Sequence, residues 1–173
     1  MRDRSKTGRV VNELNSSEKM ALRAAEGWLE LGDWRSAEEE LAQIRTELQD
    51  HLPLLRLRIE IASTSKEWER VVELAGLMIG HAPGESIGYV RRAFALHELR
   101  RTKEAWDTLL PVAGKFLDEW IVPYNLACYA AQLGELDVAR KWFDRACKLG
   151  DAKALKIEAK RDPDLAPLWA EEQ

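Results

Sequence analysis

The sequence predicts an all-helical protein built from repeated helical hairpins, and three observations support this fold class. Val, Thr and Ile are sparse beside Ala, Leu, Glu, Lys and Arg, a balance that favours helices over strands. Apolar residues recur every three or four positions, which is the spacing of one face of a helix. This pattern also repeats at an interval of 34 residues along most of the chain.

The second helix of each repeating unit shows the interval most clearly. Its apolar positions follow an i, i+4, i+7 spacing, which places them in one stripe. The first helix carries two columns in which small residues predominate, as expected where paired helices approach closely. The columns of the second helix are Ala37, Val71, Ala105 and Ala139, then Leu41, Ala75, Leu109 and Phe143, then Ile44, Met78, Val112 and Ala146. Those of the first helix are Ala25, Ile59, Ala93 and Ala127, then Trp28, Ala62, Leu96 and Ala130.

A short turn is expected between the two helices of each unit. The first and last units contain Gly32 and Gly134 there, and glycine readily takes the left-handed conformation that ends a helix. The middle units have Lys66 and Arg100 at the equivalent position. We therefore expect their turns to differ in detail or to carry backbone strain.

The interval divides the chain into an N-terminal arm, four units and a C-terminal cap. The arm, residues 1–17, is expected to be partly disordered or to form a short helix. The last part, 154–173, is expected to form a capping helix over about 153–161 and a Pro-containing tail that packs Leu165, Leu168 and Trp169 back onto the fold. The four units are 18–51, 52–85, 86–119 and 120–153.

A two-helix unit of this length with these columns resembles the tetratricopeptide repeat family. The fourth unit matches best, with the Leu126-Ala127 pair, the turn at Gly134, the aromatic Phe143 and the small Ala146. The resemblance implies a right-handed α-solenoid of about four helix-turn-helix repeats whose leading helices line a concave groove. It also implies a protein-protein interaction module, an adaptor or assembly scaffold that binds a peptide or helical segment of a partner.

The candidate binding residues are those at leading-helix positions that match the groove of this family. In the third and fourth units these positions are distinctly apolar, and an exposed apolar patch usually marks an interaction site. A different explanation, that a neighbouring repeat or the N-terminal arm covers some of them, stays open. The candidates are Leu22, Leu29, Arg56, Glu60, Ile87, Val90, Arg91, Phe94, His97, Ile121, Tyr124, Asn125 and Cys128.

Some tetratricopeptide proteins bind the C-terminal carboxylate of a chaperone tail with Lys and Asn residues. The matching positions here hold scattered cations and Asn125, while Glu26 or Glu60 would repel such a tail, so we predict no carboxylate clamp. Arg56 and Arg91 are instead expected to contact an acidic residue of a partner whose main anchors are apolar.

Catalysis and metal binding have little support in the sequence. The three histidines, His51, His81 and His97, lie in different units without metal-ligand spacing, and no phosphate-binding loop or nucleophile motif occurs. Convergence of Glu60, Cys128 and His97 on the inner face is an alternative, but a mixed wall of a peptide groove is the favoured interpretation. We predict a protein that is not an enzyme and that holds no cofactor and no metal.

Charge and hydropathy restrict the partners further. The net charge of −4 lacks the basic field that nucleic-acid binding requires, so an RNA-binding helical repeat is disfavoured. No apolar run is long enough for a membrane span, and the first residues do not resemble a secretory signal. With its cysteines interpreted as reduced thiols, the chain is expected to be cytoplasmic. A homo-oligomer stays open, as does an alternative function: a secretion-type chaperone that holds an unfolded segment of an exported protein.

Overall fold

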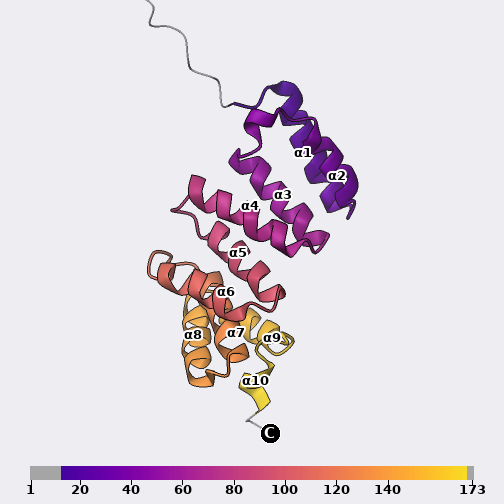
Figure 1. Cartoon of the computed structure of the whole chain (residues 1–173). Helices are drawn as coiled ribbons and strands as arrows, with labels where there is room; N and C mark the ends of the chain where they lie inside the picture. The colour runs from indigo at the N-terminus through magenta and orange to yellow at the C-terminus, as the bar shows by residue number, and fades with distance from the viewer. Residues whose placement is uncertain (1–12, 171–173) are drawn as a thin grey trace, which may run out of the picture. The chain divides into compact units, whose positions relative to one another are not determined.

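The computed structural model describes residues 13–170, in which helices and turns occur and no β-strand is found (Figure 1). The chain divides into two units, 1–61 and 62–173, and each is described by itself. The first unit holds α1 (Ser16–Glu30), α2 (Trp34–Ala42), the 3-10 helix η1 (Thr46–Leu48) and most of α3 (Leu52–Thr64). The second holds α4 (Trp68–His81), α5 (Ser86–Glu98), α6 (Thr102–Leu109), η2 (Leu110–Val112), α7 (Ile121–Gln132), α8 (Leu136–Leu149), α9 (Ala152–Ala159) and α10 (Ala166–Trp169).

The helix ends repeat at the interval that the sequence predicts. Leading helices end at Glu30, Thr64, Glu98 and Gln132, and the following helices begin at Trp34, Trp68, Thr102 and Leu136. The predicted all-helical fold of successive helical hairpins is therefore confirmed. The boundaries of the four expected repeats stay a prediction, and most of the expected N-terminal arm, residues 1–12, lies outside the described residues.

All four turns between these helices share one hydrogen-bond pattern. In each turn a backbone N–H bonds the carbonyl five residues earlier: Asp33 to Trp28, Glu67 to Ala62, Arg101 to Leu96 and Glu135 to Ala130, at 2.8–2.9 Å. The residue before each donor is left-handed, with φ of 79° at Gly32, 60° at Lys66, 63° at Arg100 and 83° at Gly134. Lys66 and Arg100 thus adopt the glycine geometry, and their turns carry backbone strain instead of taking a different form.

Replacing Arg100 by glycine is expected to raise the free energy of unfolding by about 1 kcal/mol, because glycine avoids most of the left-handed penalty but loses more chain entropy on folding. Arg100 is exposed, so few packing contacts are lost. Urea denaturation measures the change, and Lys66→Gly should behave alike. The matched control, Gly134→Ala, introduces the same strain and should destabilise. An Arg100→Gly variant less stable than the parent would contradict this explanation.

A capping box at the start of α1 is linked to the loop after α2. The Asn15 side chain accepts the Glu18 N–H at 2.9 Å, and the Glu18 carboxylate accepts the Asn15 N–H at 2.8 Å. The same carboxylate accepts hydrogen bonds from Nε and Nη2 of Arg45 at 2.5 and 3.0 Å. The hydrogen bonds from Arg45 and Asn15 lower the pKa of Glu18 from 4.5 to about 2.

This lowered pKa predicts acid sensitivity. Because the pKa of Glu18 falls from 4.5 to about 2 on folding, its ionised form contributes full stabilisation above about pH 4.5, and this is lost as the pH falls towards 2. A Glu18→Gln variant should therefore show a weaker dependence of unfolding free energy on pH across that range. Denaturant titrations at several pH values check this, with Glu30→Gln on the exposed end of α1 as the control. Parallel acid profiles for parent and Glu18→Gln would refute the assignment.

The core of the first unit lies between its helices. Ala25, Ala37, Leu41 and Leu54 are completely buried there. The stripe predicted for the second helix explains Ala37 and Leu41, and it continues to Ile44, which is also buried although α2 has already ended. Apolar spacing thus predicts the buried face better than it predicts the end of the helix.

The second unit has one contiguous core that runs from α5 to the C-terminal segment. Its α6 ends at Leu109, earlier than the apolar stripe predicts, and a 3-10 turn follows. Pro111 explains the difference, because proline lacks the N–H that would continue the helix and its ring clashes with the preceding turn. Val112 nevertheless stays buried at 8% exposure, so the stripe still faces the core.

The C-terminal segment, which the sequence predicts to be a cap, forms two helices, α9 and α10. Asp151 caps α9 by accepting the N–H groups of Lys153 and Ala154 at 2.9 and 3.1 Å. After α9 the chain turns back beside α7 and α8 (Figure 1) and buries Leu165 and Leu168. The tail also forms α10 despite its two prolines, because one of them lies in the first turn, where its missing N–H is not required.

The described helices include none that is both long and apolar enough to cross a bilayer.

Candidate binding site

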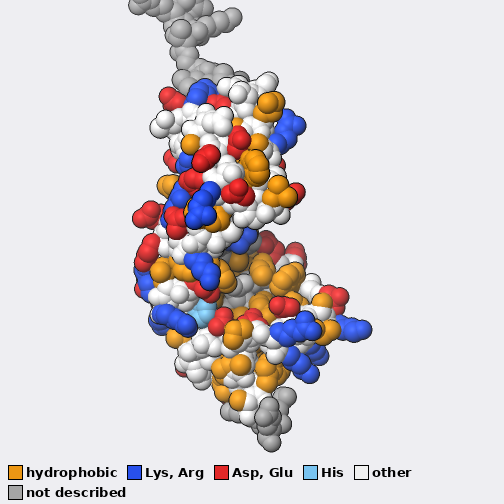
Figure 2. All heavy atoms as spheres, turned by 90° about the vertical axis from the view of Figure 1, so that its right-hand side faces the viewer, with side chains coloured by type: hydrophobic (Ala, Val, Ile, Leu, Met, Phe, Trp, Pro, Cys, Tyr) orange, Lys and Arg blue, Asp and Glu red, His pale blue; other side chains and the backbone are white. Residues whose placement is uncertain are grey.

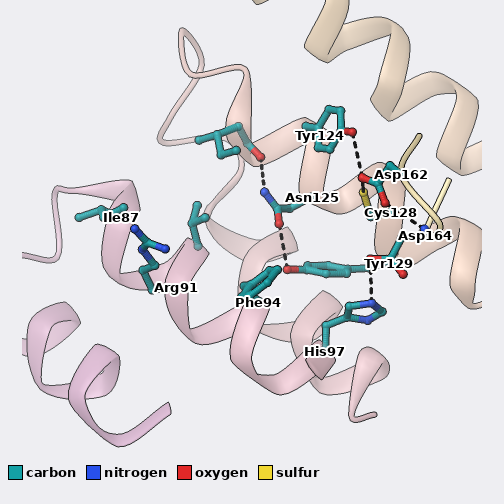
Figure 3. A pocket seen from close by; sticks show the side chains of 12 residues that line it. Ile87, Arg91, Phe94, His97, Tyr124, Asn125, Cys128, Tyr129, Asp162 and Asp164 are labelled. Atoms are coloured by element: carbon teal, nitrogen blue, oxygen red, sulfur yellow. Dashed lines mark hydrogen bonds and ion pairs between the residues drawn. The ribbon is translucent and has the colours of Figure 1, made fainter. Parts of the chain in front are cut away.

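A pocket of about 380 Å³ lies between α5 and α7 of the second unit (Figure 3). On the space-filling surface, hydrophobic side chains gather around a hollow, with a histidine and acidic side chains at its edge (Figure 2). Nine predicted binding residues line the pocket, together with three that were not predicted. The predicted ones are Ile87, Val90, Arg91, Phe94, His97, Ile121, Tyr124, Asn125 and Cys128, and the others are Tyr129, Asp162 and Asp164.

The helical register explains why the nine predicted residues come together. The α5 residues follow spacings of three and four, which places them along one face of the helix, and the α7 residues do the same. Ile87 and Arg91 lie at one end of the pocket, and Asp162 and Asp164 lie at the other (Figure 3). The pocket therefore has an apolar middle and ends of opposite charge.

Phe94 is the main exposed apolar side chain of the pocket. It keeps 37% of its surface exposed and packs edge-to-face on Trp68 of α4, with ring centroids 5.7 Å apart. Edge-to-face pairs fix the orientation of a ring, so Phe94 offers a rigid apolar surface. This is the kind of residue that commonly anchors a partner.

Asp162 joins the C-terminal segment to α7. One of its oxygens accepts the Tyr124 hydroxyl at 2.9 Å and lies 3.7 Å from the Cys128 sulfur (Figure 3). Burial, with the neighbouring carboxylate as a further cause, raises the pKa values of Tyr124 and Cys128 far above their ordinary range. Both groups are therefore neutral donors at physiological pH, and a protonated thiol is a poor nucleophile and metal ligand.

His97 connects α5, α6 and the C-terminal segment. Its Nδ1 lies 2.9 Å from the Thr102 hydroxyl, and its Nε2 lies 3.0 Å from the Asp164 carboxylate. A neutral ring satisfies both partners when Nε2–H donates to Asp164 and Nδ1 accepts from Thr102. The side chain of Gln132 also donates to the Asp164 carbonyl at 2.9 Å, which fixes the segment a second time.

Tyr129 and Asn125 form the floor of the pocket. The Tyr129 hydroxyl donates to the Asn125 side-chain oxygen at 3.2 Å, and the Asn125 amide nitrogen donates to the Ile121 carbonyl at 2.8 Å. The Tyr129 ring lies against His97, with centroids 5.3 Å apart. Burial raises the pKa of Tyr129, so its hydroxyl stays a donor.

The structure changes the expected role of four predicted residues. Val90, His97, Tyr124 and Cys128 are only 5–9% exposed, so most of their surface is packed inside the protein. The segment that contacts Tyr124 and Cys128 is the chain's own C-terminal part, for which the sequence predicts only a capping role. Tyr124 is therefore a supporting residue of the pocket wall and not an exposed anchor like Phe94.

The remaining four candidates lie in the first unit. Leu22 and Leu29 are partly buried and pack against the core of that unit. Arg56 and Glu60 are exposed on α3. None of these four lines the pocket between α5 and α7, and their role in binding stays a prediction.

Asp162 and Asp164 were missed, although the sequence carried a signal for one of them. Asp162 follows Cys128 by the same 34-residue interval that separates Cys128 from Phe94. Continuing the interval beyond the fourth unit would have placed this carboxylate level with the inner face. The two prolines beside it instead indicated only a stop to regular structure.

The positions of the His, Cys, Asp and Glu side chains bear on metal binding and on nucleophilic chemistry. Within residues 13–170 no group of three or more His, Cys, Asp or Glu side chains could hold a metal ion. The alternative in which Glu60, Cys128 and His97 converge is not supported either. The carboxylate beside Cys128 is that of Asp162, and it favours the protonated thiol. Both Cys128 and Cys147 are free thiols.

Comparison with known proteins supports the fold. No family model and no curated protein match the sequence. Among solved structures, MamA from residue 41 to its end, from Desulfovibrio magneticus RS-1, matches with a TM-score of 0.72 at 16% identity over 92% of this chain and 88% of that one. A MamA structure described as MSR-1 C2 matches with a TM-score of 0.66 at 20% identity, over 79% and 78%. The chain is thus similar to TPR-like all-helical proteins in fold.

Proposed function

We propose that this protein is a non-enzymatic interaction module that binds a peptide or helical segment of a partner protein in the pocket between α5 and α7. It would act as an adaptor or assembly scaffold of the tetratricopeptide type, in the cytoplasm. The observation that carries the proposal is the pocket itself, in which nine residues selected from sequence register converge around an exposed aromatic side chain.

The size and chemistry of the pocket support a protein ligand. A volume of about 380 Å³ is near the lower end of the range of ligand pockets, so the pocket can take only a short part of a partner. Its middle is apolar, and apolar side chains left in a concave surface lose contact with water when a partner covers them. Its polar atoms are mostly committed to internal hydrogen bonds, as at Asn125 and Tyr129, so the walls are held in place before binding.

Substitution of Phe94 tests this function. In affinity capture from the native cell extract with quantitative mass spectrometry, Phe94→Asp should lose the partners that the parent chain retains, since a carboxylate replaces the exposed ring. The matched control is Ile157→Asp, which places the same charge at a 48% exposed position of α9. Circular dichroism must show equal helicity for both variants. Retention of the same partners by Phe94→Asp would exclude the pocket as the binding site.

The alternative, a secretion-type chaperone, makes a different prediction for the captured protein. A chaperone should hold a long unfolded segment, whereas an adaptor should bind a short segment of a folded protein. Limited proteolysis of the captured complex distinguishes them, because a chaperone would protect a stretch far longer than this pocket can cover. No contact in the described residues favours the chaperone in particular.

A further inference from the structure

We propose that the partner segment carries a lysine or arginine beside its apolar anchor, and that this cation binds at the Asp162 and Asp164 end of the pocket. The inference rests on the proposed function and specifies the chemistry of the ligand. It concerns the end of the pocket that the C-terminal segment forms. The charge expected for the ligand there is opposite to that of an acidic tail.

The two carboxylates are held by groups other than lysine and arginine. Asp162 receives the hydroxyl of Tyr124 and the thiol of Cys128 on one oxygen, and the backbone N–H of Asp164 on the other at 2.9 Å. The Asp164 carboxylate lies 3.0 Å from Nε2 of His97. Neither carboxylate forms an ion pair with a lysine or arginine within residues 13–170. The two carboxylates are therefore not paired with a lysine or arginine of the described chain.

Asp164 has room for a further donor. Its side chain keeps 31% of its surface exposed, while the His97 side chain beside it keeps only 6%. An ionised carboxylate has about four acceptor sites, and the imidazole uses one of those on Asp164. A guanidinium or ammonium that enters the pocket can therefore bind Asp164 without displacing His97.

The electrostatic environment agrees with this geometry. Burial is the largest cause of the raised pKa values of Cys128 and Tyr129; Asp164 contributes to both shifts, and Asp162 contributes to that of Cys128. A negative field that disfavours a thiolate or phenolate also favours an incoming cation. An acidic side chain at the same place would meet two like charges in a partly desolvated pocket, which opposes its binding.

The position of Arg91 gives the bound segment a direction. Arg91 lies at the opposite end of the pocket from Asp162 and Asp164, beside Ile87 (Figure 3). A segment with one cation should therefore place that cation at the aspartate end and its apolar residue over Phe94. This arrangement uses the apolar middle for affinity and the aspartate end for orientation.

Defined peptides test the inference directly. The probes are fluorescein-labelled peptides with two leucines, a spacer of zero to three glycines, and arginine, glutamine or glutamate as the last variable residue. Fluorescence anisotropy with the full chain should show, at the best spacing, binding about tenfold tighter with arginine than with glutamine, and the weakest binding with glutamate. Raised salt should reduce this preference.

Variants separate charge recognition from structural support. Asp164→Asn keeps an acceptor for His97 and should reduce the arginine preference, taken as the ratio of the affinities of the arginine and glutamine peptides for the same variant, to about one. The matched control, Asp137→Asn, removes a carboxylate that is 92% exposed on α8 and should keep the preference.

Each other outcome has a definite meaning. Equal affinity for all three peptides, lost in Phe94→Asp, would overturn the cation inference and leave the proposed function standing. Tighter binding with glutamate, or an arginine preference that survives in Asp164→Asn, would also overturn the inference. Failure of every peptide to bind would count against the pocket as a binding site, and the cation inference would fall with it.

Discussion

Removal of residues 153–173 is expected to lower the free energy of unfolding by about 5 kcal/mol, because the packing of three buried leucines is lost and the surfaces that they cover become exposed to water. Leu155, Leu165 and Leu168 are all at most 7% exposed, and Ala159 is fully buried. Trp169 also packs edge-to-face on Phe143 at 5.8 Å and donates its indole N–H to the Ala159 carbonyl at 3.1 Å. The truncated chain would lose all of these contacts together.

Urea denaturation and size-exclusion chromatography measure the effect. The truncated chain should unfold at lower urea, and its uncovered α7 and α8 should promote self-association. A chain that ends after residue 170 keeps every contact named above and serves as the control. A finer variant, Leu168→Ala, should destabilise by about 2–5 kcal/mol through the cavity that it leaves. Parent-like unfolding of the truncated chain would show that the C-terminal segment is not a cap.

Much of the fold could be predicted because the repeat interval constrains it at several levels. The apolar stripe, the small-residue columns and the glycines at Gly32 and Gly134 all recur in one register, so each supports the others. The interval also predicted the turns at Lys66 and Arg100, where residue type alone argued against the left-handed geometry. Where Pro111 interrupts the pattern, local chemistry decides and the helix ends early.

The candidate site could be predicted only in part, for a physical reason. The helical register predicts which face of a helix a residue occupies. This is sufficient to predict that Ile87, Phe94 and Ile121 line the pocket. It does not tell what covers that face. The contacts of Asp162 with Tyr124 and Cys128 join a non-helical segment to α7. The 34-residue interval places Asp162 level with Cys128, but it does not predict that a segment outside the repeated helices turns back onto α7.

Loss of the Tyr129 side chain is expected to have the second large effect, this time at the floor of the pocket. Tyr129 is 1% exposed and is among the largest fully buried side chains of the described residues. Tyr129→Ala should lower the free energy of unfolding by about 3–5 kcal/mol, because a buried aromatic ring is replaced by a cavity. Urea denaturation of the full chain measures this change.

Tyr129→Phe separates the ring from its hydroxyl. It removes the donor to Asn125 but keeps the packing on His97, so it should destabilise by only about 1 kcal/mol. The lost bond also leaves the Asn125 side-chain oxygen without this donor, so the same variant should weaken peptide binding if Asn125 must be held in place for binding. A phenylalanine variant as unstable as the alanine variant would show that the hydroxyl bond, and not ring packing, holds the floor together. A large loss from alanine with a small loss from phenylalanine would instead identify the floor as a packed part of the core on which the pocket is built.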